Sequence, residues 1–335
     1  MNGYDGDFVF QIIIDSNMSE EIISFMKNPT KNDDIFRFIK YTQDNNIIID
    51  PLFYITESIA KSKSGIEKES IIEYLRAVCY IEAMDYKKTL DYGEPCFDNQ
   101  KILNICSRYG IFDSEQLFET QYNKIVNDYK YFEPSILYGF KVIQVLITYI
   151  FILKINKKSH KDAKYNMVKY VEFMECNKLL QYDVMYYVAL IVFCGGLNKF
   201  INTNLLSYDK ICKNISSSSW DIQLIHYTSD LVFLNDDIKN RSILALTKET
   251  DLYAISKIFH VDQILYYRDG YHTVTRRFSM NNMLNMIPNK KAKDMFKNLY
   301  EMNLYNKKTI FGGISYAQII NLNMKLEKDL RNSLS

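Results

Sequence analysis

The sequence feature that most constrains the fold is a short apolar run at residues 8–17, which ends abruptly in Asp15-Ser16-Asn17. A run of this length, rich in Val, Ile and Phe, predicts a buried strand. Open α/β sheets bind their ligands at the carboxyl ends of such strands, which would place Asp15 at a binding edge. The alternative is that Asp15 caps the helix expected to begin near Ser19, because Asp is a favoured N-cap residue.

A second acid-bearing turn follows at residues 46–61. The Ile-Asp-Pro sequence at 49–51 predicts an extended segment, because a residue before proline avoids the helical region. The helix expected over residues 52–61 is largely apolar, and Glu57 is its carboxylate. A carboxylate on such a helix is costly unless it is paired or lies in a solvated cleft. Glu57 is therefore a candidate site residue, with a position on the wet face of the helix as the alternative.

Further acids follow in the second half of the chain. Four serines at 216–219, followed by Trp220-Asp221, predict a helix start with Asp221 in its first turn. The helix dipole favours a carboxylate there, so helix stabilisation alone could account for Asp221. Residues 241–246 predict a second buried strand, which runs into Thr-Lys-Glu-Thr-Asp at 247–251 and then a helix. We expect the two strands to be parallel neighbours with their acids at one edge.

The order of these features resembles the PIN-like nuclease superfamily. A strand ends in Asp-x-Asn at 15–17, a helix after an Ile-Asp-Pro turn carries Glu57, and a helix start carries Trp-Asp at 220–221. A second strand then leads into a segment similar to the family's Thr-x-Asp motif. The third position of that motif is Glu249 here, and Asp251 two residues on is the candidate substitute. The resemblance covers about residues 8–60 and 215–260.

This resemblance implies a site for Mg²⁺ or Mn²⁺ and the chemistry of phosphodiester hydrolysis. Clustered carboxylates repel one another unless a cation relieves the repulsion, and hard cations prefer oxygen ligands. Asp15 and Asp221 would bind the metal directly. The remaining candidates are Glu57, Glu249 and Asp251 as catalytic ligands, Asn17 and Thr247 as hydrogen-bonding supports of those ligands, and Lys248 as a phosphate contact.

The implied fold is α/β, with a small parallel central sheet of PIN-like type flanked by helices. We expect residues 1–62 and 215–268 to form a discontinuous catalytic core, residues 66–214 a helical insertion, and residues 269–335 a basic, mostly helical part. Residues 271–335 hold eleven Lys or Arg against four Asp or Glu, which is a weak hint of a polyanionic partner. Solvated helix faces explain this asymmetry equally well.

The apolar run at residues 136–153 is almost long enough to span a membrane. Lys141 and Gln144 lie three apart inside it, so we expect a buried helix of a soluble insertion instead, with one wet side. The six cysteines form no C-x-x-C pair, and the chain begins without a signal-peptide pattern, which together favour a reducing cytoplasm.

We therefore expect a metal-dependent ribonuclease of a toxin, defence or RNA-processing system, with RNA favoured over DNA as substrate. The insertion could in addition bind a protein partner. The first alternative is a catalytically inactive PIN-like scaffold that binds RNA or a protein. The second is a helical interaction protein in which every one of these acids is a cap or a surface residue.

Overall fold

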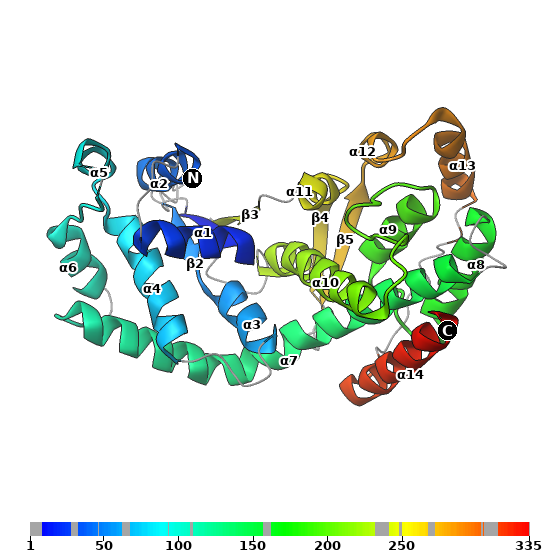
Figure 1. Ribbon diagram of the computed structural model, residues 1–335, viewed down its shortest axis with the longest axis horizontal. Helices are drawn as coiled ribbons and strands as arrows, with labels where there is room; N and C mark the ends of the chain where they lie inside the picture. The colour runs from blue at the N-terminus through cyan, green and yellow to red at the C-terminus, as the bar shows by residue number, and fades with distance from the viewer. Residues whose placement is uncertain are drawn as a thin grey trace. The chain divides into compact units, whose positions relative to one another are not determined.

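The computed structural model describes residues 9–27, 33–45, 47–61, 68–92, 94–107, 110–156, 162–231, 241–247, 250–266, 272–302, 304 and 314–334. The chain divides into two compact units. The first unit comprises Met1–Ile136 and Leu224–Lys248, and the second comprises Leu137–Gln223 and Glu249–Ser335. Each unit is described by itself below (Figure 1), and the domain limits expected from the sequence stay predictions.

The first unit is built around a three-stranded parallel sheet of order β2-β1-β3. The central strand is β1 (Val9–Ile14), flanked by β2 (Ile48–Asp50) and β3 (Arg241–Leu246). Ile12 lies opposite Ile49 on one side and Leu244 on the other. The predicted parallel pairing of the strands that end before Asp15 and at Leu246 is confirmed, and so is an α/β fold with a large helical portion.

Both faces of β1 are buried, as expected for a parallel strand. Ile12 and Ile14 face one core, which they share with residues of α1 (Ser16–Lys27), α2 (Asp33–Asp44) and α4 (Lys68–Ala83). Ile13 points to the opposite face and is also fully buried. The strand contacts α3 (Leu52–Lys61), the helix that carries Glu57.

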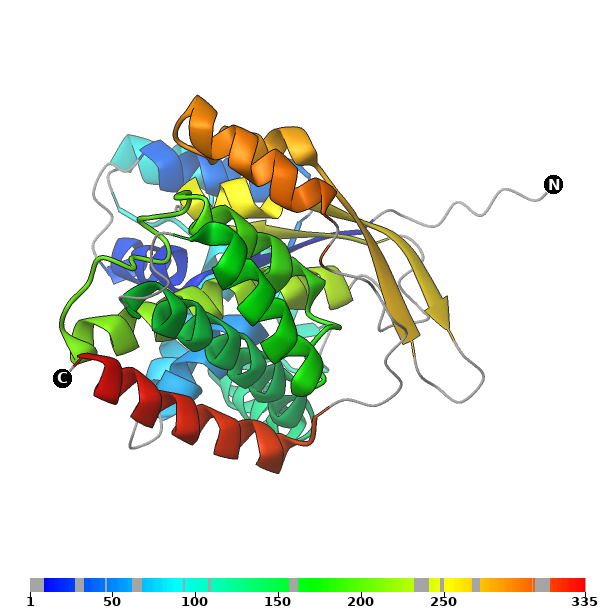
Figure 2. The ribbon, with the colours of Figure 1, turned by 90° about the vertical axis from the view of Figure 1, so that its right-hand side faces the viewer.

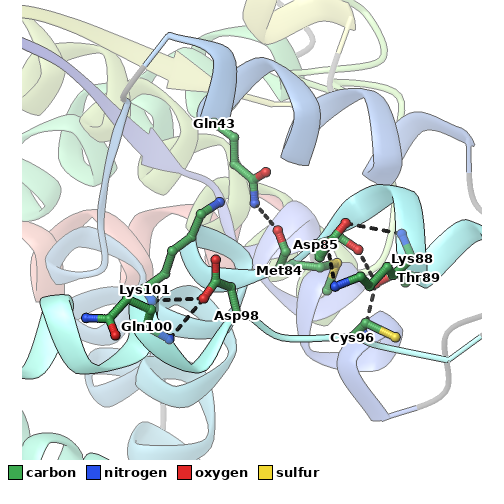
Figure 3. Close-up of polar contacts among 9 residues, drawn as sticks. All are labelled: Gln43, Met84, Asp85, Lys88, Thr89, Cys96, Asp98, Gln100 and Lys101. Carbon is green, nitrogen blue, oxygen red and sulfur yellow. Dashed lines mark hydrogen bonds and ion pairs between the residues drawn. The ribbon is translucent and has the colours of Figure 1, made fainter.

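The rest of the first unit is helical and extends from α4 through α5 (Tyr86–Tyr92) and α6 (Asn99–Ser107). Figure 3 shows the hydrogen bonds that hold the chain between α4 and α6 in place. The Asp85 amide donates to the Cys96 carbonyl oxygen at 2.8 Å, and the Cys96 amide donates to the Thr89 hydroxyl at 2.9 Å. The Asp98 carboxylate accepts the Gln100 amide at 2.9 Å and so caps the start of α6.

The second unit is mostly helical among its described residues and contains one antiparallel hairpin. Its strands β4 (Phe259–Tyr266) and β5 (His272–Phe278) lie side by side in Figure 2. The helices are α8 (Ala163–Cys176), α9 (Asp183–Phe193), α10 (Tyr208–Leu231), α11 (Thr250–Ser256), α12 (Met280–Asn285), α13 (Lys290–Glu301) and α14 (Tyr316–Leu334). The helix α7 (Ser114–Ile155) belongs to both units, and so does α10.

The apolar run at residues 136–153 is helical, as predicted, but it is not a separate helix. It continues the helix expected over 114–130, so that α7 has 42 residues. Ile136–Ile155 is long and apolar enough to cross a membrane by length and composition, and 67% of its apolar window is buried. Lys141 donates to Gln144 at 2.9 Å, and burial lowers the pKa of Lys141. The cytoplasmic location stays a prediction.

Two local predictions are wrong. The serines at 216–219 do not start a helix, because α10 begins at Tyr208 and runs through them. Two of their hydroxyls have carbonyl acceptors: Ser219 donates to Ile215 inside α10, and Ser218 donates to Phe200 in the segment before α10, each at 2.6 Å. The helix expected over 252–259 ends at Ser256, and the β4–β5 hairpin follows it.

Candidate active site at the carboxyl edge of the parallel sheet

Asp15 lies directly after β1, and its two carboxylate oxygens have different surroundings. The Asp15 amide donates to the Leu246 carbonyl oxygen at 3.1 Å, which fixes the residue beside the end of β3. One carboxylate oxygen, Oδ1, accepts the Met18 amide at 2.8 Å and caps α1. The other, Oδ2, is buried and has no hydrogen-bond partner among the residues that the structure describes. Asp15 therefore does cap α1, as the alternative interpretation expected, but the cap uses only one of its two carboxylate oxygens.

Glu57 lies close to Asp15 and inside the protein. Its side chain is buried, with 4% exposure, so it does not lie on the wet face of α3. Burial raises the pKa of the Glu57 carboxyl, and the nearby Asp15 charge raises it further. The Lys61 ammonium and a hydrogen bond with Ser16 act in the opposite direction. The structure thus brings two predicted site residues together and adds Lys61, one turn further along α3, as the cation that pairs with Glu57.

Asp50 is a third acid at this edge of the sheet, and the sequence argument did not propose it as a site residue. Its Oδ1 accepts the Leu52 amide at 2.8 Å and its Oδ2 accepts the Gln11 side-chain amide. Burial raises the pKa of the Asp50 carboxyl, and both hydrogen bonds lower it. Asp50 is thus a satisfied structural residue that joins β1, β2 and α3. The Asp-Pro pair before an expected helix is the sequence signal that could have identified this cap.

The other predicted residues are placed as follows. Asn17 is exposed in the first turn of α1, and half-buried Thr247 directly follows β3 at the Asp15 edge. Lys248 and Glu249 lie outside the described residues. Asp221 is half-buried inside α10 instead of at a helix start, and Asp251 is in the first turn of α11. These last two belong to the second unit, and their membership of the site stays a prediction.

The chemistry of this pair suits a hard cation. Mg²⁺ and related ions are often held by only one or two carboxylates, with waters and substrate phosphates as the other ligands. Asp15 Oδ2 is a buried acceptor without a partner among the described residues, and such an oxygen can bind a cation or a water. Among the residues that the structure describes, no three His, Cys, Asp or Glu side chains gather to hold a metal. The pair therefore fits an ion that keeps most of its waters.

The comparisons with known proteins give no relative from which to transfer a function. No family model, curated protein or solved structure matches the chain. The resemblance to PIN-like nucleases consequently depends on the residues quoted above, and any function of the site has to be argued from the buried Asp15–Glu57 pair itself.

Proposed function

We propose that the chain is a metal-dependent phosphodiesterase of PIN-like type whose substrate is RNA. The observation that carries this proposal is the meeting of Asp15 and Glu57 at the carboxyl edge of a parallel sheet, with Asp15 Oδ2 buried and without a partner. A carboxyl edge is where open α/β sheets bind their ligands. A purely structural cap would need only the one oxygen that Met18 uses.

In this proposal Asp15 and Glu57 are the residues that hold Mg²⁺ or Mn²⁺. Such an ion supplies a nucleophilic hydroxide from bound water at neutral pH and neutralises charge on the phosphate. Asp15 is oriented for the task because its Oδ1 is fixed by the Met18 amide and its backbone by Leu246. Burial raises the pKa of the Glu57 carboxyl, and the Lys61 ammonium acts against this rise and so favours the carboxylate form that a metal binds.

A catalytically inactive scaffold that binds RNA or a protein partner is the second candidate. The observation that favours it is the Glu57–Lys61 ion pair, since Lys61 already occupies an oxygen of the second carboxylate. The shortage of a third ligand within the described residues points in the same direction. The third hypothesis, in which all acids are caps or surface residues, agrees less well with a Glu57 side chain that is 4% exposed.

An RNA cleavage assay with Mn²⁺ tests the proposal. The purified chain, the Asp15→Asn and Glu57→Gln variants and an Asp98→Asn control are incubated with a mixed-sequence RNA, with and without EDTA. Asp98 is a matched control because its carboxylate also caps a helix through one oxygen, at the start of α6. Asn caps about as well as Asp, so a cap by itself predicts no loss in either variant.

We expect cleavage by the unmodified chain and by Asp98→Asn, loss of at least two orders of magnitude in Asp15→Asn, and a smaller loss in Glu57→Gln. Full cleavage by Asp15→Asn would rule out Asp15 as an essential ligand. If none of the proteins cleaves RNA, but Mn²⁺ binds only where Asp15 is present, the scaffold replaces the enzyme.

A further inference from the structure

A pocket of about 380 Å³ lies in the second unit, between the C-terminal end of α8 and α14, and both apolar and polar side chains line it. The polar side chains that line it are Asn177, Lys178, Gln318, Asn321 and Lys325. They come from segments far apart in the sequence, the turn after α8 and the exposed face of α14. The pocket is thus a built feature of the fold of the second unit.

The charge of this pocket has one sign. Lys178 and Lys325 both line it, and no Asp or Glu is among the lining residues that the structure describes. Neither lysine makes a salt bridge with any described residue, whereas other lysines of the chain do, for example Lys169 with Glu172 at 2.7 Å. Two lysines that line one concavity, and that have no salt bridge within the described part of the chain, attract an anion.

Lys178 occupies a position where the backbone would favour glycine. Its φ is 58°, in the left-handed region, directly after the Asn177 cap of α8. Helices commonly end with such a residue, which is usually Gly and sometimes Asn because other side chains are strained there. The Leu179 amide donates to the Met174 carbonyl oxygen at 2.8 Å and completes the turn. The backbone of the turn therefore does not require a lysine, and Lys178 lines the same pocket as Lys325.

We propose that this pocket binds a phosphate group through Lys178 and Lys325. Lysine is a common phosphate ligand that acts as a point charge, and the three neighbouring amides can donate further hydrogen bonds to the phosphate oxygens. The pocket exceeds the volume of one phosphate, which leaves room for the group that carries it. A nucleic-acid backbone and a free phosphate compound share this chemistry, and the experiment separates them.

Binding measurements without catalysis test this inference, so that its outcome is independent of the Asp15 site. Calorimetric titration with inorganic phosphate at low ionic strength, and fluorescence anisotropy with a short single-stranded RNA in EDTA, are compared across variants. The pocket variants are Lys178→Gly, Lys178→Asn and Lys325→Gln. The control is Lys328→Gln, which removes an exposed lysine of α14 that does not line the pocket.

We expect each pocket variant to weaken phosphate binding about tenfold, and the control to change it less than about twofold. Lys178→Gly should also melt at a higher temperature than the unmodified chain, because Gly relieves the left-handed backbone. A parallel loss of RNA affinity would identify a nucleic-acid backbone as the source, and unchanged RNA affinity would identify a free phosphate compound. Phosphate binding that is absent from the unmodified chain, or equal in all variants, would overturn the inference.

Discussion

Asp15→Asn should stabilise the metal-free protein, although the substitution removes a native charge. The amide oxygen of Asn can keep the hydrogen bond from the Met18 amide, which is 2.8 Å in the structure. The amide NH₂ then replaces Oδ2, the buried oxygen that has no partner, next to the buried Glu57 carboxylate. The substitution thereby removes an unsatisfied oxygen and a charge that repels Glu57.

The size of the effect follows from the cost of the orphaned oxygen. A buried acceptor without a partner costs about 1–3 kcal/mol, so Asp15→Asn should raise the local free energy of unfolding by about that amount in EDTA. Asp15→Ala is the contrasting variant, because it also removes the cap and should lose about 1 kcal/mol of helix stability. Without metal, we expect Asp15→Asn to be the most stable protein and the unmodified chain to come second. Asp15→Ala should be equal to the unmodified chain or less stable.

Metal should reverse this order. A ligand that binds only the folded state adds about 4.1 kcal/mol of stability at 1,000 times its Kd, which exceeds the gain expected for Asp15→Asn. Mn²⁺ would supply this gain to the unmodified chain and to Asp98→Asn, and little of it to Asp15→Asn. Asp15→Asn should thus be more stable than the unmodified chain without Mn²⁺ and less stable with it. A purely structural Asp15 would not produce this reversal.

Hydrogen exchange is the appropriate assay. The chain has two compact units, so its global unfolding need not be one transition. Exchange of peptides from β1 and α1 reports the opening free energy where Asp15 lies. Faster exchange in Asp15→Asn than in the unmodified chain, in EDTA, would refute the reasoning, since it would mean that the Asp15 charge already has a stabilising partner.

Three further predictions concern other parts of the chain. Burial raises the pKa of the Glu57 carboxyl in the folded state, so its protonation stabilises the fold fully below the unfolded pKa of about 4.5, and this stability is lost as pH rises through the raised folded pKa. The free energy of unfolding in urea should therefore fall from pH 4 to pH 7 more steeply for the unmodified chain than for Glu57→Gln. Parallel pH profiles of the two proteins would contradict this. Gly196→Ala should destabilise the second unit by about 1–3 kcal/mol, because the new Cβ would lie 2.7 Å from the Met286 carbonyl oxygen, and an unchanged urea midpoint would refute that clash. The Ile136–Ile155 segment should leave the expressed chain in the supernatant after ultracentrifugation, whereas salt-resistant sedimentation with membranes would show a spanning helix.

The parallel sheet could be predicted because its signal is local. Two β-branched runs bounded by polar turns identify buried strands, and their common parallel direction follows from the crossover rule. The start of α10 could not be predicted in this way, because serines usually favour helix starts, whereas here Ser219 donates to a carbonyl inside the helix and Ser218 donates to Phe200 outside it. The β4–β5 hairpin had a sequence signal in Asp269-Gly270, between two strand-forming runs, that the sequence reasoning did not use.

The candidate site was predicted in part. Asp15 and Glu57 were recognisable because each is a carboxylate in an apolar segment, where its presence requires a reason. Their proximity needed the structure, since it depends on how α3 packs on β1. Lys61 could not be assigned from sequence, because a lysine at a helix end is an ordinary surface residue. The Asp50 cap had a signal in the Asp-Pro pair, but that signal does not show its place at the sheet edge.

Calorimetric titration of Mn²⁺ tests the central claim most directly, because it measures metal binding at Asp15 without depending on the correct substrate. The unmodified chain, Asp15→Asn and Asp98→Asn are titrated under identical conditions. The account predicts equal affinity for the unmodified chain and Asp98→Asn, and at least about tenfold weaker binding by Asp15→Asn. Equal Mn²⁺ affinity in all three proteins, or no binding by the unmodified chain, would contradict the claim that Asp15 is a metal ligand.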